Sequence, residues 1–372
     1  MKRRFAAGLV ATWLSAISTV MAIEWREGDR VVLVGNTFVE RAQSYGHVET
    51  SLAAGLAGRS ITFRNLGWSG DTVYGDARSY FGPPQEGFDR LSKHLEEIKP
   101  TIIVSVYGAV AAFDGPAGLD SFLKGYARLL DMMVEKTGAR VVLMSPPPLE
   151  NLPSPLPNQD AQNRNLAAYR DGIQKLASQR GHDFADLFEA MGAGRLANRK
   201  PALTENGVHY TEPGYAVIAP LIAELIGVDS SPMRVEANSA TVRLTPRSLA
   251  GHSVLLKVSG LSPGDYTLNS TDGQTILTAS DRVWQEGTTI HQRLWSREYD
   301  QLRQAVIDKN QVFFHRWRPQ NETYLFGFRK HEQGNNAVEV PQFDPIVAAA
   351  DAKIQALAEP QPVTLTLTKR SN

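Results

Sequence analysis

The sequence predicts an α/β fold: three α/β/α layers around a parallel sheet, followed by a small antiparallel β unit and a C-terminal arm. Short, uninterrupted apolar runs recur along the first part of the chain, and amphipathic stretches of helical period separate them. This alternation is typical of a parallel sheet that is covered by helices on both faces. A change in composition at 228–233 predicts the boundary to the β unit.

The predicted strands of the sheet are short and rich in β-branched residues. They lie at 31–35, 61–66, 101–107, 140–145 and 182–188. The predicted helices lie at 38–57, 86–98, 117–137, 160–180 and 214–227. Ligands of such sheets bind at the carboxyl ends of the strands. We therefore expect the functional residues in the loops that follow, at 35–37, 67–72, 108–114, 146–160 and 204–210.

The second half of the chain differs in pattern. Strand-like runs fill 234–284, and TDGQT at 271–275 is a hairpin signal. A helical pattern returns at 294–310, and a helix at 345–357 and a β-like tail at 362–368 close the chain. We expect four parts, which are a leader (1–22), the layered domain (23–230), the small β unit (231–290) and a helical or extended arm that packs back on the core (291–372).

The N-terminus has the layout of a secretory signal peptide. Lys2, Arg3 and Arg4 precede an apolar run that ends near Val20, and a small residue, Ala22, occupies the −1 position of a cleavage site. An uncleaved anchor is the alternative, but the apolar run is short against the roughly 20 residues that span a bilayer. We expect a secreted or periplasmic protein with no membrane span after cleavage.

Composition excludes several classes of function. The chain has no cysteine, so disulfides and thiolate nucleophiles are ruled out. Its 39 basic residues balance 39 acidic ones, which argues against nucleic acid as a partner. The eight histidines show no metal-binding spacing. We expect no metal and no cofactor, and the oligomeric state stays open.

Four loops carry the chemistry, in chain order. The first is Gly35-Asn36-Thr37, after the first strand, and the second is RNLGWSGDT at 64–72. YGAVAAF at 107–113 and NGVHYTEPGY at 206–215 are the third and fourth. In their order and spacing they resemble the blocks of the SGNH/GDSL hydrolase superfamily, over about residues 28–228. The resemblance implies a flavodoxin-like sheet and an ester hydrolase.

The resemblance also implies roles for individual residues. Thr37 stands where the family has its nucleophilic serine, and His209 stands at the catalytic histidine. Gly70 would donate its backbone N–H to the oxyanion, and Asn206 would orient His209 without charge. The substrate would be surrounded by Asn36, Asp71, Tyr107 and Val110.

Three positions depart from the family pattern. Thr37 replaces serine, and its methyl group crowds the hydroxyl. Val110 replaces an asparagine that donates to the oxyanion, and loss of one such donor costs about 10²–10³-fold in rate. Asn206 replaces the aspartate that orients the histidine, a change that costs about 10⁴-fold in a serine protease. These losses do not simply add.

Other features support the hydrolase interpretation. The Gly-Asn-Thr and Asn-Gly-Val-His versions resemble a divergent bacterial branch of the superfamily, which shares a C-terminal segment like HRWRPQNETYLFGFRKHEQG (315–334). Unassigned acids that could orient His209 lie near the loops, at Glu40, Asp71, Asp114 and Glu205. The alternative roles are structural: Thr37 as the N-cap of the following helix, and Gly70 as an ordinary turn glycine.

The arm from 313 to 345 is dense in aromatic, arginine and amide side chains. Such groups bind sugars and anions. The candidate substrate-binding residues there are His315, Arg316, Arg318 and Asn321. The alternative is that the segment packs its aromatic residues on the core, because its apolar and polar residues alternate as in a strand lying on a sheet.

We therefore predict an extracytoplasmic SGNH/GDSL-type ester hydrolase-like protein, directed at acylated carbohydrate or small esters, with a degraded catalytic set. The first alternative is a catalytically inactive protein that binds a glycan in the same cleft. A further alternative is an envelope protein that binds a partner through the 313–345 arm.

Overall fold

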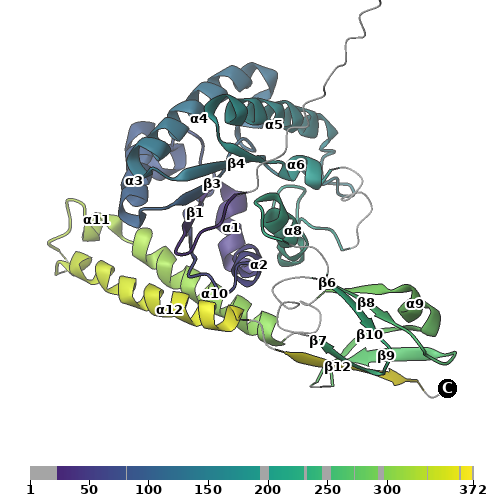
Figure 1. Cartoon of the computed structure of the whole chain (residues 1–372). Helices are drawn as coiled ribbons and strands as arrows, with labels where there is room; N and C mark the ends of the chain where they lie inside the picture. The colour runs from purple at the N-terminus through teal and green to yellow at the C-terminus, as the bar shows by residue number, and fades with distance from the viewer. Residues whose placement is uncertain are drawn as a thin grey trace, which may run out of the picture.

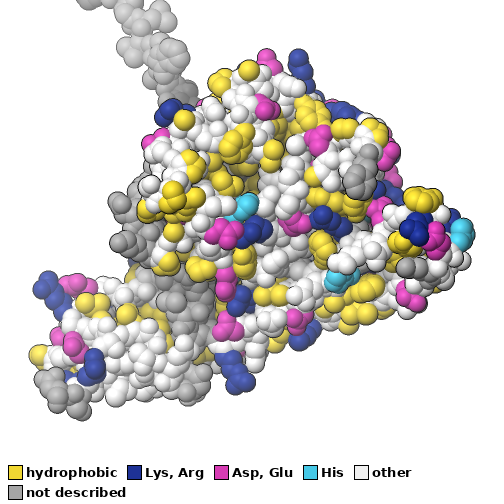
Figure 2. All heavy atoms as spheres, turned by 180° about the vertical axis from the view of Figure 1, so that it is seen from behind, with side chains coloured by type: hydrophobic (Ala, Val, Ile, Leu, Met, Phe, Trp, Pro, Cys, Tyr) yellow, Lys and Arg dark blue, Asp and Glu magenta, His cyan; other side chains and the backbone are white. Residues whose placement is uncertain are grey.

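The computed structural model describes residues 23–80, 82–192, 201–229, 233–244, 253–271, 273–291, 297–332, 334–359 and 362–370. The predicted signal peptide, 1–22, lies outside the described residues. In the described part of the chain, no helix is long and apolar enough to cross a membrane. Basic and acidic side chains are interspersed on the face that Figure 2 shows, as the balanced composition suggests.

The predicted parallel sheet is confirmed. Its strand order is β2-β1-β3-β4-β5, and every neighbouring pair runs parallel. The strands are β1 (Arg30–Gly35), β2 (Thr62–Asn65), β3 (Ile102–Val106), β4 (Arg140–Met144) and β5 (Asp183–Ala185). This is the flavodoxin-like order, in which sites form at the carboxyl ends of the strands. β5 is shorter than predicted, because the short helix α6 (Leu187–Ala190) follows it at once.

Helices cover both faces of this sheet and complete the three layers (Figure 1). One apolar cluster joins one face of the sheet to the α1, α2 and α8 side, and the other cluster joins the opposite face to α3, α4 and α5. The bounds are α1 (Thr37–Tyr45), α2 (His47–Gly55), α3 (Pro84–Ile98), α4 (Gly115–Thr137), α5 (Asp160–Arg180) and α8 (Glu212–Leu225), with short 3₁₀ turns η1 (Asp76–Ser79) and η2 (Ala111–Asp114).

The single helix predicted at 38–57 is wrong, because the chain turns at Gly46. This glycine has φ +72°, a left-handed conformation that ends α1 before α2 begins. A Cβ at this position would lie 2.9 Å from the side chain of Ile307. Glycine therefore allows both the turn and the close approach of a C-terminal helix.

The β unit contains two small sheets. One has the order β10-β9-β12-β7, and the other has the order β11-β8-β6. The predicted hairpin is confirmed, since β9 and β10 pair antiparallel on either side of 271–274. The antiparallel sheet of the unit is confirmed, and in the second sheet β6 and β8 pair in parallel. The bounds are β6 (Met233–Ala237), β7 (Thr241–Leu244), β8 (Ser253–Val258), β9 (Asp265–Asn269), β10 (Thr275–Ser280), α9 (Asp281–Glu286), β11 (Thr288–His291) and β12 (Val363–Lys369).

The C-terminal arm contributes to both parts of the molecule. Its long helices α10 (Arg297–Trp317) and α12 (Phe343–Ala358) lie side by side against the layered domain, and α11 (Glu322–Leu325) and η5 (Asn336–Gln342) connect them (Figure 1). Strand β12 then inserts between β9 and β7 of the β unit. The strand-like alternation expected after 313 is wrong for 313–317, because this segment continues α10 as a helix and buries Phe313 and Trp317.

Buried ion pairs attach the arm to the layered domain. Lys309 of α10 is fully buried, and its Nζ lies 2.7 Å from Oε1 of Glu49 on α2. Arg64, at β2, pairs with Asp351 of α12 at 2.6 Å. A buried pair of this kind is strongly destabilising when one partner is removed, since the other charge is then left without compensation.

Candidate active site

The first loop connects β1 to α1 and begins the site. Asn36 is the N-cap of α1, and its side chain accepts a hydrogen bond from the Phe38 N–H at 3.3 Å. The alternative role of Thr37 as N-cap is therefore wrong, because Thr37 is the first residue of the helix itself. Its hydroxyl is free of the capping role and lines a pocket.

The second loop places Gly70 beside Thr37. The Gly70 N–H points at Thr37 Oγ1 over 3.3 Å. Gly70 has φ +75°, which favours glycine. The loop lies close to α1, because a Cβ on Gly67 would be 2.3 Å from the backbone nitrogen of Glu40. The expected nucleophile and the expected oxyanion donor are thus in contact.

A buried network supports this loop from below. Asp71 Oδ2 accepts hydrogen bonds from Arg78 Nε at 2.6 Å and from the Tyr107 hydroxyl at 2.8 Å. All three side chains are almost completely buried. Burial, with the Asp71 carboxylate beside it, raises the pKa of Tyr107, so its hydroxyl stays protonated and donates. The prediction that Asp71 and Tyr107 bind substrate is corrected, because both lie beneath the surface of the site.

The third loop brings Val110 to the site without a donor. Val110 precedes η2, is 39% exposed and lines the same pocket as Thr37. Its side chain cannot donate a hydrogen bond to an oxyanion. Phe113, at 62% exposure, adds a second apolar group. The third loop therefore makes the pocket wall apolar.

The pocket at the carboxyl ends of the strands has a volume of about 160 Å³. Thr37 and His209, which are far apart in the sequence, both line it. Most of the other lining groups are apolar or aromatic, and Arg41 brings a charge to the lining. The lining residues are Asn36, Thr37, Phe38, Arg41, Ala109, Val110, Phe113, Pro147, Leu149, Val208, His209, Tyr210 and Tyr215.

His209 has the side-chain amide of Asn206 beside its ring. The Asn206 Nδ2 lies 3.2 Å from His209 Nδ1. The Asn206 Oδ1 already accepts the backbone N–H groups of Val208 at 3.0 Å and His209 at 2.8 Å, and these two bonds determine which way the amide faces. The amide therefore donates to Nδ1, and the imidazole carries its proton on Nε2. A histidine in this tautomer cannot accept a proton at Nε2.

One of the unassigned acids does lie near His209. The Glu205 Oε1 is 3.6 Å from His209 Nδ1, and both side chains are partly exposed. The same oxygen lies 3.0 Å from Arg41 Nη2, so the arginine competes for it. Sequence reasoning missed Arg41, although its spacing of four residues from Thr37 on α1 places the two on one helix face. Arg78 had no comparable signal in the sequence.

A second hollow, of about 360 Å³, lies between α1 and α10 beside the first pocket. Arg41 lines both. Polar side chains dominate its lining, which is Glu40, Arg41, Gln43, Ser44, Asn310, Gln311, Phe314 and His315.

The structure separates the four residues predicted in the arm. His315 lines the polar hollow. Arg318 binds Glu40 at 2.7 Å and lies over the ring of Trp68. Arg316 instead binds Asp344 of α12 at 2.7 Å, which ties the two helices together. Asn321 is exposed at the start of α11, with a positive φ of 61°, and lines neither hollow.

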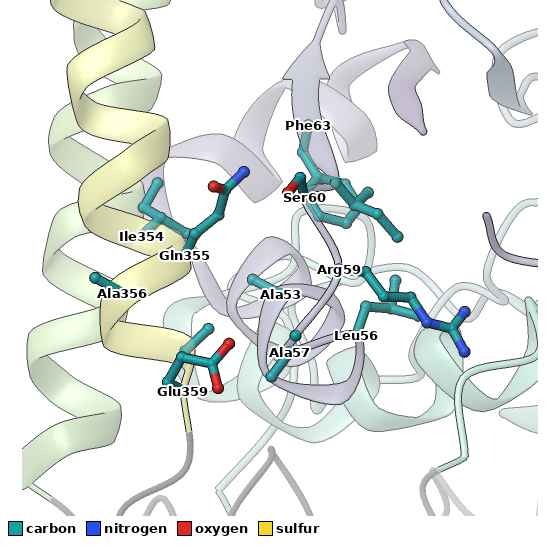
Figure 3. A pocket seen from close by; sticks show the side chains of 13 residues that line it. Ala53, Leu56, Ala57, Arg59, Ser60, Phe63, Ile354, Gln355, Ala356 and Glu359 are labelled. Atoms are coloured by element: carbon teal, nitrogen blue, oxygen red, sulfur yellow. The ribbon is translucent and has the colours of Figure 1, made fainter. Parts of the chain in front are cut away.

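A further hollow, of about 270 Å³, lies between the end of α2 and the end of α12 (Figure 3). Ala53 and Leu56 lie on one side of it, and Ile354 and Glu359 on the other. It contains none of the predicted site residues. Within the residues that the structure describes, no group of three or more His, Asp or Glu side chains is arranged to hold a metal ion.

The strand order and the four loops that meet at its carboxyl edge are those of a flavodoxin-like protein of the SGNH class. The family model for the GDSL-like lipase/acylhydrolase family matches residues 32–217, half of the chain. The chain belongs to this family, and the predicted superfamily is confirmed. No curated protein sequence matches the chain.

Three solved structures are similar to this chain, and the first of them shows the same fold. A gut microbial diltiazem-metabolizing enzyme is 15% identical, with a TM-score of 0.62, over 93% of this chain and 99% of the enzyme. This likeness extends beyond the GDSL region to the β unit and the C-terminal helices. A catalytic mutant of an acetylxylan esterase from Geobacillus stearothermophilus is 17% identical over 56% of this chain and 98% of its own, with a TM-score of 0.45. An alpha/beta hydrolase enzyme from the metagenome of Lake Arreo, Spain, is 20% identical over 55% and 97%, with a TM-score of 0.43.

Proposed function

We propose that this protein is an extracytoplasmic ester hydrolase of weak activity, directed at small esters or acylated carbohydrate. One observation carries the proposal: Thr37 contacts the Gly70 N–H and shares a single pocket with His209. A hydroxyl, a backbone donor and an imidazole are the groups that acyl transfer requires. The extracytoplasmic location rests on the signal-like sequence at 1–22.

In the proposed reaction, Thr37 Oγ1 attacks the acyl carbon of the ester. His209 accepts the threonine proton, and the negative charge on the former carbonyl oxygen is stabilised by the Gly70 N–H and the Thr37 N–H, which lies in the first turn of α1. The alcohol then leaves with the proton from His209. Water attacks the acyl-threonine and His209 takes a proton from it; His209 then returns this proton to Thr37 Oγ1 as the acid is released. The Gly70 N–H must turn from Thr37 Oγ1 to the oxyanion when substrate enters.

Weak activity follows from the groups around His209. For His209 to act as the base through Nε2, its proton must move to Nδ1, where Asn206 presents a donor. Glu205 supports the active tautomer, because its carboxylate can accept a hydrogen bond from the Nδ1–H once Arg41 moves aside. The tautomer with its proton on Nδ1 is then the minor one. The rate is proportional to the fraction of molecules in that tautomer.

The two adjoining hollows support a substrate with two chemically different ends. The apolar pocket beside Thr37 holds about 160 Å³, enough for a small acyl group. The polar hollow between α1 and α10 suits the sugar that carries it. Arg41 stands between the two and can bind either end.

The test is the hydrolysis of acetyl esters by pure protein, with acetylated xylose and p-nitrophenyl acetate as probes. We expect slow turnover that Thr37→Ala and His209→Ala both abolish. Arg282→Ala, at an exposed pair with Glu286 in the β unit, serves as the control that retains it. Equal rates in all four proteins would refute the proposed mechanism.

The second candidate function is ligand binding without turnover. The donor that Asn206 presents to His209 Nδ1 favours it, because the resulting Nε2–H binds a carbonyl oxygen but removes no proton. A binding protein should gain thermal stability from acetylated xylose without releasing acetate. Release of acetate in proportion to protein concentration, lost in Thr37→Ala, favours the hydrolase.

A further inference from the structure

The end of helix α10 reaches the loop that carries Gly70. Arg318 follows the last residue of the helix, and its guanidinium carbon lies 3.5 Å from the ring centroid of Trp68. Its Nη1 donates to Glu40 Oε1 over 2.7 Å. Both arginine and glutamate are largely shielded from solvent, at 23% and 18% side-chain exposure. The contact is therefore desolvated enough to hold its geometry.

Glu40 extends this contact to the loop. Its Oε2 accepts the backbone N–H of Ser69 at 2.7 Å, and it also accepts the Ser69 hydroxyl. Ser69 directly precedes Gly70, whose N–H faces Thr37 Oγ1. Two donors of one residue bound to one carboxylate restrict the position of that residue, and with it the direction of the next N–H.

Gly70 has little other support. A Cβ built on it would meet nothing within 4 Å, so no neighbouring group packs against that side of the residue. Its position depends on the residues on either side, Ser69 and Asp71. Asp71 is held from below by Arg78, and Ser69 is held from the outside by Glu40.

Trp68 adds a second link to the arm. It is 4% exposed, and besides Arg318 its ring contacts Trp317 in an edge-to-face arrangement with the two centroids 5.8 Å apart. Cation–π contacts of desolvated arginine are among the stronger ones. Arg318 thus touches the loop directly at Trp68 and indirectly at Ser69.

We propose that Arg318 is a positioning residue: through Glu40 and Trp68 it holds Ser69 and the Gly70 N–H in place, so that the C-terminal arm completes the catalytic loop. The inference rests on the proposed function, since a held donor matters only where an oxyanion forms. It assigns to the arm a part in catalysis that the four loops of the hydrolase domain do not supply.

The first experiment measures the loop without requiring turnover. Amide resonances of Ser69 and Gly70 are recorded in the mature protein labelled at serine and glycine. The Glu40 carboxylate should shift the Ser69 amide downfield, and Glu40→Gln and Arg318→Ala should both move the Ser69 and Gly70 signals. Asp351→Asn is the matched control, because Asp351 forms another arm-to-domain pair, with Arg64. Unchanged signals in Arg318→Ala, or equal changes in Asp351→Asn, overturn the proposal.

The second experiment measures hydrolysis of p-nitrophenyl acetate. A misplaced donor costs up to about 10²-fold in rate, so Arg318→Ala should lower kcat by about 10- to 100-fold with KM little changed. Arg318→Lys keeps the charge but loses the planar contact with Trp68, and its kcat should lie between that of the wild type and that of Arg318→Ala. A change in KM alone overturns the positioning role. If the wild-type protein hydrolyses no ester, the proposed function fails, and the amide resonances alone decide whether Arg318 holds the loop.

Discussion

The side-chain amide nitrogen of Asn206 lies 3.2 Å from Nδ1 of His209, with the amide oxygen held by two backbone N–H groups. This geometry selects the tautomer of the neutral imidazole. A donor at Nδ1 leaves the proton on Nε2, the nitrogen that a general base needs free. The same pair of residues therefore explains both why the site resembles a hydrolase and why we expect it to be slow.

Asn206→Asp should raise activity. The carboxylate can keep one oxygen on the backbone N–H groups and turn the other toward His209 Nδ1, which then carries the proton. We expect kcat for p-nitrophenyl acetate to rise at least about 10-fold, since the reverse change costs about 10⁴-fold in a serine protease. Asn206→Ala should not raise it. A rate in Asn206→Asp no higher than in the wild type would show that tautomer choice does not limit the reaction.

Restoring the other two positions should add to this gain. Thr37→Ser removes the methyl group that crowds the hydroxyl, and Val110→Asn adds a donor at a half-exposed pocket wall. The triple variant with Asn206→Asp should exceed each single variant, although the gains will not simply multiply. The measurement is kcat of all combinations. A folded triple variant with no activity would mean that these positions do not form one site.

Glu205→Gln should lower activity by about 2- to 5-fold, because an ion pair this exposed contributes at most about 1 kcal/mol. The decisive comparison is a double-mutant cycle with Asn206→Asp. Once an aspartate at 206 binds Nδ1, loss of the Glu205 carboxylate should have no further effect. An equal loss in both backgrounds would assign Glu205 a role that does not pass through His209.

His94 should make stability depend on pH. It is partly buried on α3 with its ring 5.3 Å from that of Trp317, and burial, aided by nearby arginine and lysine charges, lowers its pKa from 6.5 to about 3. The folded protein thus binds fewer protons than the unfolded chain between these values. The contribution of His94 is complete above pH 6.5 and is lost as the pH falls toward 3.

The measurement is urea unfolding at pH 7 and pH 5. Between these values the wild type should lose about 2 kcal/mol more unfolding free energy than His94→Gln, at about 1.4 kcal/mol per pKa unit. Parallel losses in the two proteins would show that His94 is protonated without cost in the folded state.

Lys309→Ala should destabilise the protein by about 3–5 kcal/mol, because it leaves the buried Glu49 carboxylate without its partner. Burial lowers the pKa of Lys309 and raises that of Glu49, so each needs the other to stay charged. Replacing both, as Lys309→Met with Glu49→Leu, should recover most of the loss. Chemical denaturation measures the free energy of unfolding of the wild type and both variants. An unchanged free energy in Lys309→Ala would contradict the role of Lys309 as the partner of the buried Glu49 carboxylate.

Much of the fold followed from local patterns. Apolar runs such as VVLVG at 31–35 indicate buried strands because parallel sheets are covered on both faces, and the structure has β1 at Arg30–Gly35. The turn at Gly46 was missed, since the helical period continues across it and only the approach of α10 requires the glycine. The helical end of α10 was missed because its aromatic and polar residues alternate as in a strand.

Some features of the site also followed from the sequence, and others did not. The order of its four loops follows from the sequence, because the carboxyl ends of parallel strands meet at one edge of the sheet. The direction of the Asn206 amide does not, since two backbone N–H groups set it. The burial of Asp71 and Tyr107 did not follow from local patterns either. The sequence near a polar residue does not show whether its hydrogen-bond partner is a ligand at the surface or a buried side chain such as Arg78.

By itself, then, the sequence determined the family, the layered α/β fold and the substitutions at 37, 110 and 206, all of which depend on residue type and order along the chain. Only the tertiary structure decided which nitrogen of His209 carries the proton, which acid lies beside it, and that Arg318 contacts Glu40 across 278 positions of sequence. These are distances between groups brought together by packing, and no local pattern specifies them.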